Sequence, residues 1–144
     1  TDRLLDKNRN HGLPPFLAHD PGVDSGLMIA QYTQAGLVSE CKRLAVPASV
    51  DSIPSSAMQE DHVSMGWHAG RKLRSAVSHL TTIIAIEFMT ASRGIELRAP
   101  LSPAETTGEL VREMRLTTSG PGPDEFLAPQ IEASRQLVQS KFLS

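Results

Sequence analysis

The chain has 144 residues, of which 40% are hydrophobic and 21% are charged, and its 14 basic and 16 acidic side chains leave a formal net charge of −2. A chain of this length can bury one hydrophobic core. Its near-neutral charge disfavours nucleic acids and anionic membranes as partners, because a protein needs an excess of basic residues to bind either of them. The single cysteine, Cys41, cannot form an internal disulfide, and no stretch approaches the roughly 20 apolar residues of a transmembrane helix, so we expect a cytoplasmic protein.

Residues 1–24 are predicted to form an irregular lead-in to the fold. Prolines and glycines are dense there, and they fix turns or remove the backbone donors that a helix needs. The residues concerned are Gly12, Pro14, Pro15, Pro21 and Gly22.

The first long helix is predicted over residues 27–45. Asp24 and Ser25 can cap its N-terminus, and Pro47 ends it. Between these limits the chain has no proline and is apolar on nearly every side, Tyr32 included, so we expect this helix to be buried all round. Residues 47–54 are then expected to form a loop.

A second long helix is predicted from Leu73 to Gly94, the residue that we expect to cap its C-terminus. Apolar residues recur there at spacings of three and four, which places them on one stripe of the helix. We expect this stripe to pack against other helices. It consists of Leu73, Val77, Leu80, Ile84, Phe88 and Ala91.

Two weaker helices are predicted toward the C-terminus. Ser102-Pro103 begins one that continues through Met114. Residues 117–123, rich in glycine and proline, separate it from the other, which begins at Pro129. The apolar face of this last helix holds Ile131, Val138 and Phe142.

These elements predict an all-α fold, a bundle built on two long helices. We divide the chain into the lead-in (1–24), a core of long helices that includes the Gln59-Glu60 segment (25–98) and C-terminal helices (99–144). The two short C-terminal helices cannot cover the apolar surface of the two long ones. We therefore expect partner helices, supplied by further sequence or by other subunits.

The signatures of several common catalytic and cofactor sites are missing from the sequence. The five histidines include no pair four residues apart with a glutamate between them, so we expect no metal site. No glycine-rich loop precedes a Lys-Ser or Lys-Thr pair, and Pro121 and Pro123 remove the amide donors that a phosphate-binding loop uses. No serine lies in a Gly-x-Ser-x-Gly turn, which leaves a serine hydrolase without support.

One polar cluster remains, at residues 55–66, close to the start of the second long helix. One interpretation is that its serines and acidic residues cap that helix and interact with the positive end of the helix dipole. Another is that the cluster forms the floor of a pocket, in which Glu60 acts as an acid, a base or the partner of a cation. The residue types alone leave both interpretations open. The polar side chains of the cluster include Gln59, Glu60, Asp61, His62 and several serines.

The same cluster lies within a longer resemblance to a known family. Three segments carry it: Ser-Gly-Leu-Met-Ile-Ala-Gln at 25–31, Pro-Ala-Ser-Val-Asp-Ser-Ile-Pro at 47–54 and Gln-Glu-Asp-His-Val-Ser-Met-Gly at 59–66. The similarity continues through 12–17, 93–98 and 120–124. In this order, and over nearly the whole chain, the segments resemble the C-terminal part of the histidine ammonia-lyases, members of the aromatic amino acid lyase family.

The resemblance implies an all-α, tetrameric enzyme with a central bundle of long helices and active sites shared between subunits. Family members eliminate ammonia from an aromatic amino acid with an electrophilic methylidene-imidazolone (MIO), which forms from an internal Ala-Ser-Gly tripeptide. For L-histidine the products are trans-urocanate and ammonia. The implied role is therefore in histidine catabolism, with a homo-oligomer or an N-terminal lyase portion as the partner.

Glu60 is the residue to which the resemblance assigns a catalytic role. It matches an active-site glutamate of the histidine enzymes, at a position where phenylalanine and tyrosine lyases carry glutamine. A carboxylate can accept a hydrogen bond from an imidazole ring and stabilise its charge, whereas a carboxamide suffices beside a phenyl ring. Gln59 and His62 are expected to support the Glu60 backbone and the helix entrance.

The sequence departs from the family pattern at two residues and in one tripeptide. Cys41 follows Ser39-Glu40 where asparagine or another residue is frequent. Met58 stands where many members have asparagine. More important, Ala-Ser occurs at 48–49, 91–92 and 133–134 without a following glycine, so no Ala-Ser-Gly is present in the 144 residues. We therefore expect that this chain does not form the MIO cofactor and is inactive alone. A complete enzyme is expected to contain MIO.

Two alternatives remain. A non-catalytic helical assembly module, descended from the lyase, would keep the bundle helices and associate with itself or with a full-length lyase. A phenylalanine or tyrosine lyase, or an aminomutase, would keep the cofactor and change the substrate. An Ala-Ser-Gly segment upstream in the reading frame would argue against the first alternative, and Glu60 argues against the second.

Overall fold

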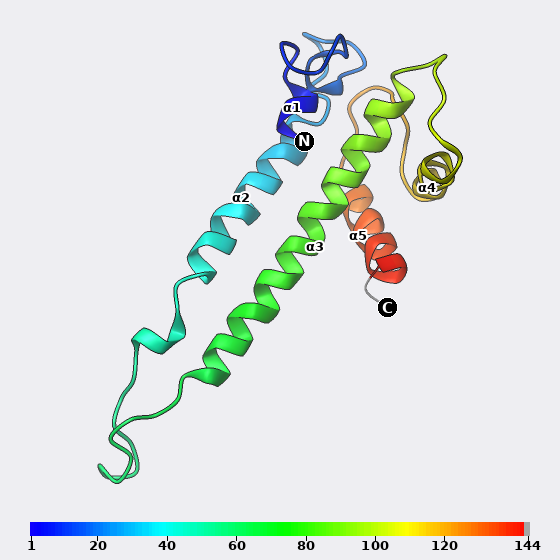
Figure 1. Cartoon of the computed structure of the whole chain (residues 1–144). Helices are drawn as coiled ribbons and strands as arrows, with labels where there is room; N and C mark the ends of the chain where they lie inside the picture. The colour runs from blue at the N-terminus through cyan, green and yellow to red at the C-terminus, as the bar shows by residue number, and fades with distance from the viewer. Residues whose placement is uncertain (143–144) are drawn as a thin grey trace.

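The computed structural model describes residues 1–142, and helices joined by irregular segments make up this part of the chain (Figure 1). No strand occurs between residues 1 and 142, so the predicted all-α fold class is confirmed. The elements in chain order are α1 (Asp2–Leu5), the 3-10 helix η1 (Pro15–Leu17), α2 (Met28–Leu44), the 3-10 helix η2 (Ala48–Val50), α3 (Gly66–Glu96), α4 (Glu105–Arg115) and α5 (Ala128–Phe142).

The two long helices, α2 and α3, form a hairpin. They lie side by side in opposite directions, and the loop that joins them projects beyond both (Figure 1). Gln34 of α2 is buried and donates a hydrogen bond from Nε2 to the carbonyl oxygen of Ile83 in α3, at 2.8 Å. A buried amide needs such a partner, so this bond fixes one level at which the helices face each other.

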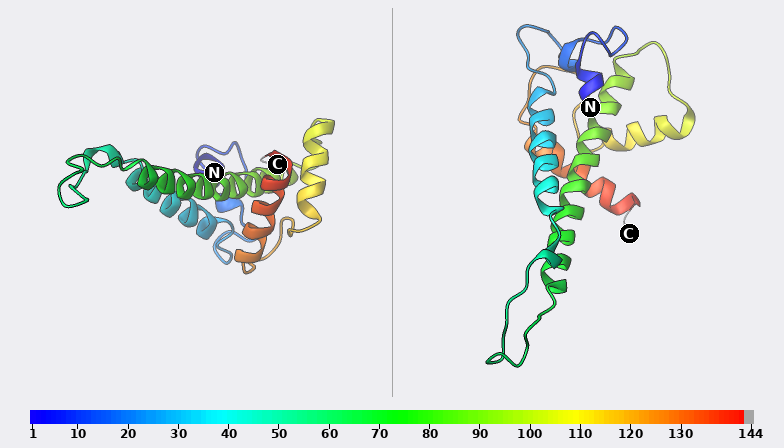
Figure 2. Two further views of the ribbon diagram at one scale, coloured as in Figure 1. Left: turned by 90° about the horizontal axis from the view of Figure 1, so that it is seen from below. Right: turned by 60° about the vertical axis from the view of Figure 1, so that its left-hand side comes forward.

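The main core lies at the end of the hairpin away from that loop, where the lead-in folds over both helices (Figure 2). Gly94 of α3 is part of this contact, because a Cβ placed there would lie 3.7 Å from Leu4 and 3.8 Å from both Leu13 and Leu17. These are ordinary van der Waals distances, so the leucines of the lead-in lie directly over Gly94 with room left for a methyl group. The buried core residues are Leu5, Leu13, Leu17, Leu27, Ala30, Ile86 and Met89.

The C-terminal helices cover part of α3. α5 packs across α3, while α4 extends to one side of it (Figure 2). Both helices bury a few apolar residues, Val111 and Met114 from α4 and Val138 from α5. Phe142, expected on the same buried face as Val138, is exposed.

The helix ends differ from the sequence predictions. α3 begins at Gly66 rather than at Leu73, and it ends at Glu96, so Gly94 lies inside the helix and is not its cap. The N-cap of α2 is Leu27, without a side-chain hydrogen bond, so the predicted cap at Asp24 and Ser25 is wrong.

Apolar side chains remain exposed on both long helices. On α3, Leu73, Val77, Leu80 and Ile84 are 66%, 50%, 52% and 45% exposed. On α2, Ile29, Tyr32 and Val38 are exposed, so the expectation that this helix is buried all round is wrong for the described chain. These are the surfaces for which the sequence analysis expected partner helices. None of the helices within residues 1–142 is both long and apolar enough to span a membrane.

Candidate functional site

The polar cluster of residues 55–66 lies in the loop between η2 and α3, at the tip of the hairpin (Figure 1). The loop is irregular from residue 51 to residue 65, and the first turn of α3 holds no acidic residue. Glu60 and Asp61 therefore precede the helix and do not cap it. The capping interpretation is therefore wrong for the acidic residues. It holds for one serine of the cluster, because the Ser64 hydroxyl accepts a hydrogen bond from the Gly66 amide, the first of α3, at 3.2 Å.

A tight turn over residues 55–60 presents Glu60. The Ser55 amide donates to the Glu60 carbonyl at 2.9 Å, and the Glu60 amide donates to the Ser55 carbonyl at 3.3 Å. Between these residues, Ser56, Ala57 and Met58 all have positive φ, at 52°, 53° and 71°. Left-handed backbone is costly for residues that carry a Cβ, so the surrounding bonds must hold this turn in place.

A second closure lies at the base of the loop. The Ser52 hydroxyl accepts a hydrogen bond from the Val63 amide at 2.9 Å and donates one to the Val63 carbonyl at 3.0 Å. Both residues are half-buried, whereas residues 53–62 are exposed. In the described chain, no main-chain pair joins the two limbs at this level, so one side-chain hydroxyl connects them.

The three predicted site residues lie on this loop in different settings. Glu60 and Gln59 are exposed in the turn, and within the described part of the chain the Glu60 carboxylate has no hydrogen bond or ion pair. His62 lines a cavity of about 460 Å³ together with Ser49 and Asp51, and Glu60 does not line it. The structure thus brings Gln59 and Glu60 together and places His62 beside a separate hollow.

The loop is held by residues other than the predicted supports. In the described chain, the side chains of Gln59 and His62 make no hydrogen bond to it, so their supporting role stays a prediction. Ser55 holds the Glu60 backbone, and Ser52 closes the base. Sequence reasoning missed Ser52, because its partner lies 11 residues away across a segment without any periodic pattern.

The turn of residues 55–60 offers one carboxylate for chemistry, that of Glu60, which makes no hydrogen bond or ion pair in the described chain. Within residues 1–142, no group of three or more His, Cys, Asp or Glu side chains could hold a metal ion. A carboxylate in this position can accept a hydrogen bond, hold or release a proton, or pair with a cation.

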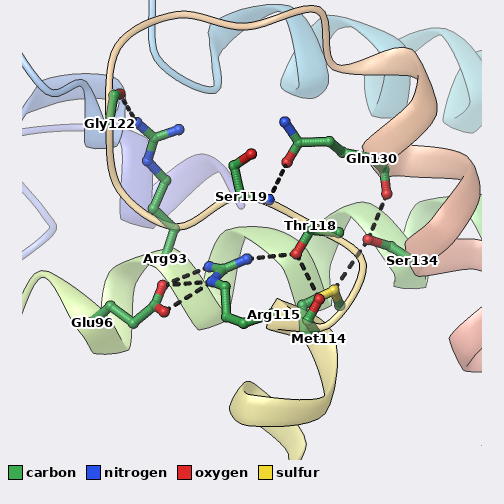
Figure 3. A network of polar contacts seen from close by, with 9 residues as sticks. All are labelled: Arg93, Glu96, Met114, Arg115, Thr118, Ser119, Gly122, Gln130 and Ser134. Atoms are coloured by element: carbon green, nitrogen blue, oxygen red, sulfur yellow. Dashed lines mark hydrogen bonds and ion pairs between the residues drawn. The ribbon is translucent and has the colours of Figure 1, made fainter.

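A separate polar network holds the connection between α4 and α5 against α3 (Figure 3). Arg115, at the end of α4, contacts Glu96 of α3 with an Nη2–Oε2 distance of 2.6 Å and donates from Nη1 to the Thr118 hydroxyl at 2.7 Å. Arg93 of α3 is buried, which lowers the pKa of its guanidinium, and it donates to the Gly122 carbonyl at 2.7 Å. These contacts lie far from the loop of residues 51–65 and hold the irregular connection of residues 116–127 against α3.

This connection carries Asp124 to the start of α2. Its carboxylate accepts hydrogen bonds from the amides of Ser25, at 2.7 Å, and Gly26, at 2.8 Å. The bond from Ser25, and then that from Gly26, hold the pKa of the Asp124 carboxyl below its usual range. A carboxylate from the C-terminal part of the chain therefore holds the two residues that precede Leu27, the N-cap of α2.

The chain is similar to proteins of one known family. The sequence model of the aromatic amino acid lyases matches residues 1–116. A histidine ammonia-lyase of Streptomyces avermitilis is 67% identical over 140 residues, which cover 96% of this chain and 27% of the relative. The chain thus spans about a quarter of that relative's length.

Two solved structures are similar over the same share of the chain. The histidine ammonia-lyase from Trypanosoma cruzi is 40% identical and aligns with a TM-score of 0.91, over 96% of this chain and 27% of that one. The tyrosine aminomutase from Streptomyces globisporus is 33% identical and aligns with a TM-score of 0.87, again over 96% and 27%. The fold of the described chain therefore recurs in enzymes with different substrates.

Proposed function

Because this chain belongs to the aromatic amino acid lyase family, we propose that it is the C-terminal region of a histidine ammonia-lyase, which eliminates ammonia from L-histidine to give trans-urocanate. The observation that carries the proposal is the 67% identity to the Streptomyces avermitilis enzyme over 140 residues. The identity to the tyrosine aminomutase is 33%.

In this proposal Glu60 is the catalytic residue that the chain contributes. Its exposed carboxylate has no partner in the described chain and lies on a turn closed at both ends. It accepts a hydrogen bond from the N–H of the substrate imidazole and stabilises the positive charge of a protonated ring. A carboxamide at the same place could accept the hydrogen bond but could not balance that charge.

The MIO group of this family supplies the electrophile of the reaction. The 144 residues contain no Ala-Ser-Gly from which it could form, so the residues present here do not fit its formation and another segment of the complete enzyme provides it. This chain contributes Glu60 and its long helices, whose exposed stripe packs against an N-terminal lyase portion or other subunits. Alone, the chain is inactive.

A chimera tests the proposal. The chain replaces the matching segment of the Streptomyces avermitilis enzyme, and urocanate formation from L-histidine is followed by absorbance. We expect product from the chimera and none from the 144-residue chain by itself. A folded, assembled chimera that makes no urocanate would contradict the proposal, and activity of the chain alone would contradict its lack of the cofactor.

The role of Glu60 is tested in the same chimera. We expect Glu60→Gln to lower kcat for L-histidine by about 100-fold, because the negative charge beside the imidazole is lost. Asp61→Asn is the matched control, since it removes one charge from the adjacent exposed residue. Unchanged turnover in Glu60→Ala would show that Glu60 has no such role.

Two rivals are kept for specific reasons. The tyrosine aminomutase shares the fold with a TM-score of 0.87, so L-tyrosine and L-phenylalanine are offered to the chimera and to its Glu60→Gln variant. Preference of the unsubstituted chimera for either would favour that rival. The exposed stripe on α3 suits the other rival, a non-catalytic assembly module. A chimera without activity, together with stable association of this chain with the lyase, would favour that rival.

A further inference from the structure

The turn that carries Glu60 has little of the fold to hold it, because it projects beyond the ends of α2 and α3 (Figure 1). In the described chain, two contacts join its limbs: the main-chain pair of Ser55 and Glu60, and the hydroxyl of Ser52 on Val63. We propose that Ser52 is a positioning residue that, by clasping Val63, sets where the Glu60 carboxylate lies. This inference rests on the proposed function.

The geometry of the clasp is reciprocal. The Ser52 Oγ accepts from the Val63 amide at 2.9 Å and donates to the Val63 carbonyl at 3.0 Å, so both main-chain groups of Val63 are bonded to one hydroxyl. The pair at Ser55 and Glu60 achieves the same with main-chain atoms alone. A side chain can replace such a main-chain pair only if it both donates and accepts a hydrogen bond. The hydroxyl of serine does both, whereas the methyl group of alanine does neither.

Strain in the turn makes the clasp necessary. Ser56, Ala57 and Met58 have φ of 52°, 53° and 71°, whereas extended and right-handed backbone are lower in energy for residues with a Cβ. Inside the turn the amides of Met58 and Gln59 donate to the carbonyls of Ser55 and Ser56, both at 3.1 Å, and bonds at its two ends add to these. The main-chain pair holds the tip and Ser52 holds the base, so without Ser52 the limb that carries Glu60 can swing.

The clasp lies apart from the main core. Neither Ser52 nor Val63 belongs to the core cluster, which is at the opposite end of the hairpin (Figure 2). Its loss should therefore leave the rest of the fold intact and move only the loop. A shift of about 1 Å in a catalytic group can cost about 100-fold in rate, so the effect appears in catalysis.

The experiment uses the chimera with three substitutions. Ser52→Ala removes the hydroxyl, Ser52→Thr retains it, and Ser55→Ala is the matched control, because the pairing of Ser55 uses main-chain atoms that alanine keeps. We expect Ser52→Ala to lower kcat by about 10-fold, and Ser52→Thr and Ser55→Ala to stay within about 2-fold of the unsubstituted chimera.

A double-mutant cycle separates positioning from general damage. If Ser52 acts through the Glu60 carboxylate, then Ser52→Ala should change kcat by less than about 2-fold when Glu60→Gln is already present. Amide hydrogen exchange of residues 53–62 gives a measurement independent of activity. Exchange should be faster in Ser52→Ala and unchanged in Ser55→Ala.

The outcomes separate this inference from the proposed function. If Ser52→Ala lowers kcat equally with Glu60 present and with Glu60→Gln, this inference is wrong but the proposed function is not affected. The same holds if Ser52→Ala speeds amide exchange without any loss of kcat. Loss of the folded assembly in Ser52→Ala, seen by circular dichroism and sedimentation, would also overturn it, because the clasp would then be structural. An unaffected kcat in Glu60→Gln would instead disprove the catalytic role of Glu60, on which the inference depends.

Discussion

Met58 adopts a backbone conformation that suits a different residue. Its φ is 71°, in the left-handed region that glycine and asparagine enter at low cost, and its side chain is exposed and gains little from packing. The resemblance to the histidine ammonia-lyases indicates that many members carry asparagine here. The turn that presents Glu60 therefore contains a strain that one substitution can relieve.

We expect Met58→Asn to stabilise the turn by about 0.5–1 kcal/mol, since left-handed backbone costs roughly 1–2 kcal/mol for a residue with an ordinary side chain and less for asparagine. The measurement is amide hydrogen exchange at Gln59 and Glu60, whose amides donate to the carbonyls of Ser56 and Ser55. Exchange at both amides should slow by about 3-fold if it follows local opening.

The same substitution at Met65 serves as the control for Met58→Asn. Met65 has φ of −90°, so asparagine relieves no strain there. Faster exchange in Met58→Asn, or an equal slowing in both variants, would contradict the explanation by backbone strain.

Single residues of the site were predictable only where a pattern or a resemblance pointed to them. Glu60 was proposed because its neighbours match a known family, and its exposed, unpaired carboxylate suits the role. The left-handed residues at 56–58 were not predicted, because none of them is glycine. Ser52 was missed for a similar reason, since its bond to Val63 joins distant parts of an irregular loop.

Among the elements, α2 depends at its start on the connection to α5. The amides of Ser25 and Gly26 donate to the carboxylate of Asp124, which lies beyond α4 in the sequence. Both amides lie just before Leu27, the N-cap of α2, so these bonds hold the chain as it enters the helix, and a negative charge near a helix start interacts favourably with the helix dipole. One carboxylate thus joins the first long helix to the C-terminal part of the fold.

We expect Asp124→Asn to lower the melting temperature near neutral pH, because an amide is a weaker acceptor and carries no charge. The folded state holds the pKa of Asp124 below its ordinary value of 3.8. The ionised carboxyl therefore stabilises the fold above the ordinary pKa, and this contribution is lost as the pH falls through the lower folded pKa. The difference in melting temperature between Asp124→Asn and the unsubstituted chain should therefore shrink as the pH falls.

Thermal unfolding, followed by circular dichroism from about pH 7 to about pH 3, checks this pH dependence. Asp20→Asn is the control, because the Asp20 carboxylate makes no hydrogen bond within the described chain. Equal melting temperatures of Asp124→Asn and the unsubstituted chain at neutral pH would show that the bonds of Asp124 to Ser25 and Gly26 do not stabilise the fold.

The existence of the helices could be predicted from periodicity, but several of their ends could not. α3 starts at Gly66, ahead of the apolar stripe, because a long helix extends into weak helix formers once it has been nucleated. Gly94 stays helical because the lead-in packs over it. The chain that enters α2 is held by Asp124. The ends of these helices are therefore set by tertiary contacts that no local pattern contains.

The whole molecule leaves its longest helix without a partner along one face. Leu73, Val77, Leu80 and Ile84 follow spacings of four and three, as in helices that pack along a shared seam, yet all four are exposed. At its two ends the stripe borders other helices of the chain, because Leu73 lines a hollow with Leu44 of α2 and Ile84 lines one with Val138 of α5. The stripe was predicted from the sequence, and its cover by partner helices stays a prediction, because all four residues are exposed in the described chain.

We expect the paired substitution Leu73→Gln and Leu80→Gln to separate the stability of the chain from its assembly. Both side chains are exposed, so thermal unfolding of the 144-residue chain should change by about 0.5 kcal/mol or less. In the active chimera the same pair should shift sedimentation toward smaller species, because burial of a leucine contributes about 1.5–3 kcal/mol at each contact.

Arg74→Gln is the control for this pair, since Arg74 is exposed on α3 and lies off the stripe. It should leave the sedimentation of the chimera unchanged. If the leucine pair also leaves the assembly intact, the stripe is not an interface, and the need for partner helices inferred from it is wrong. If the pair instead unfolds the 144-residue chain, the two leucines support the hairpin itself, which their exposure argues against.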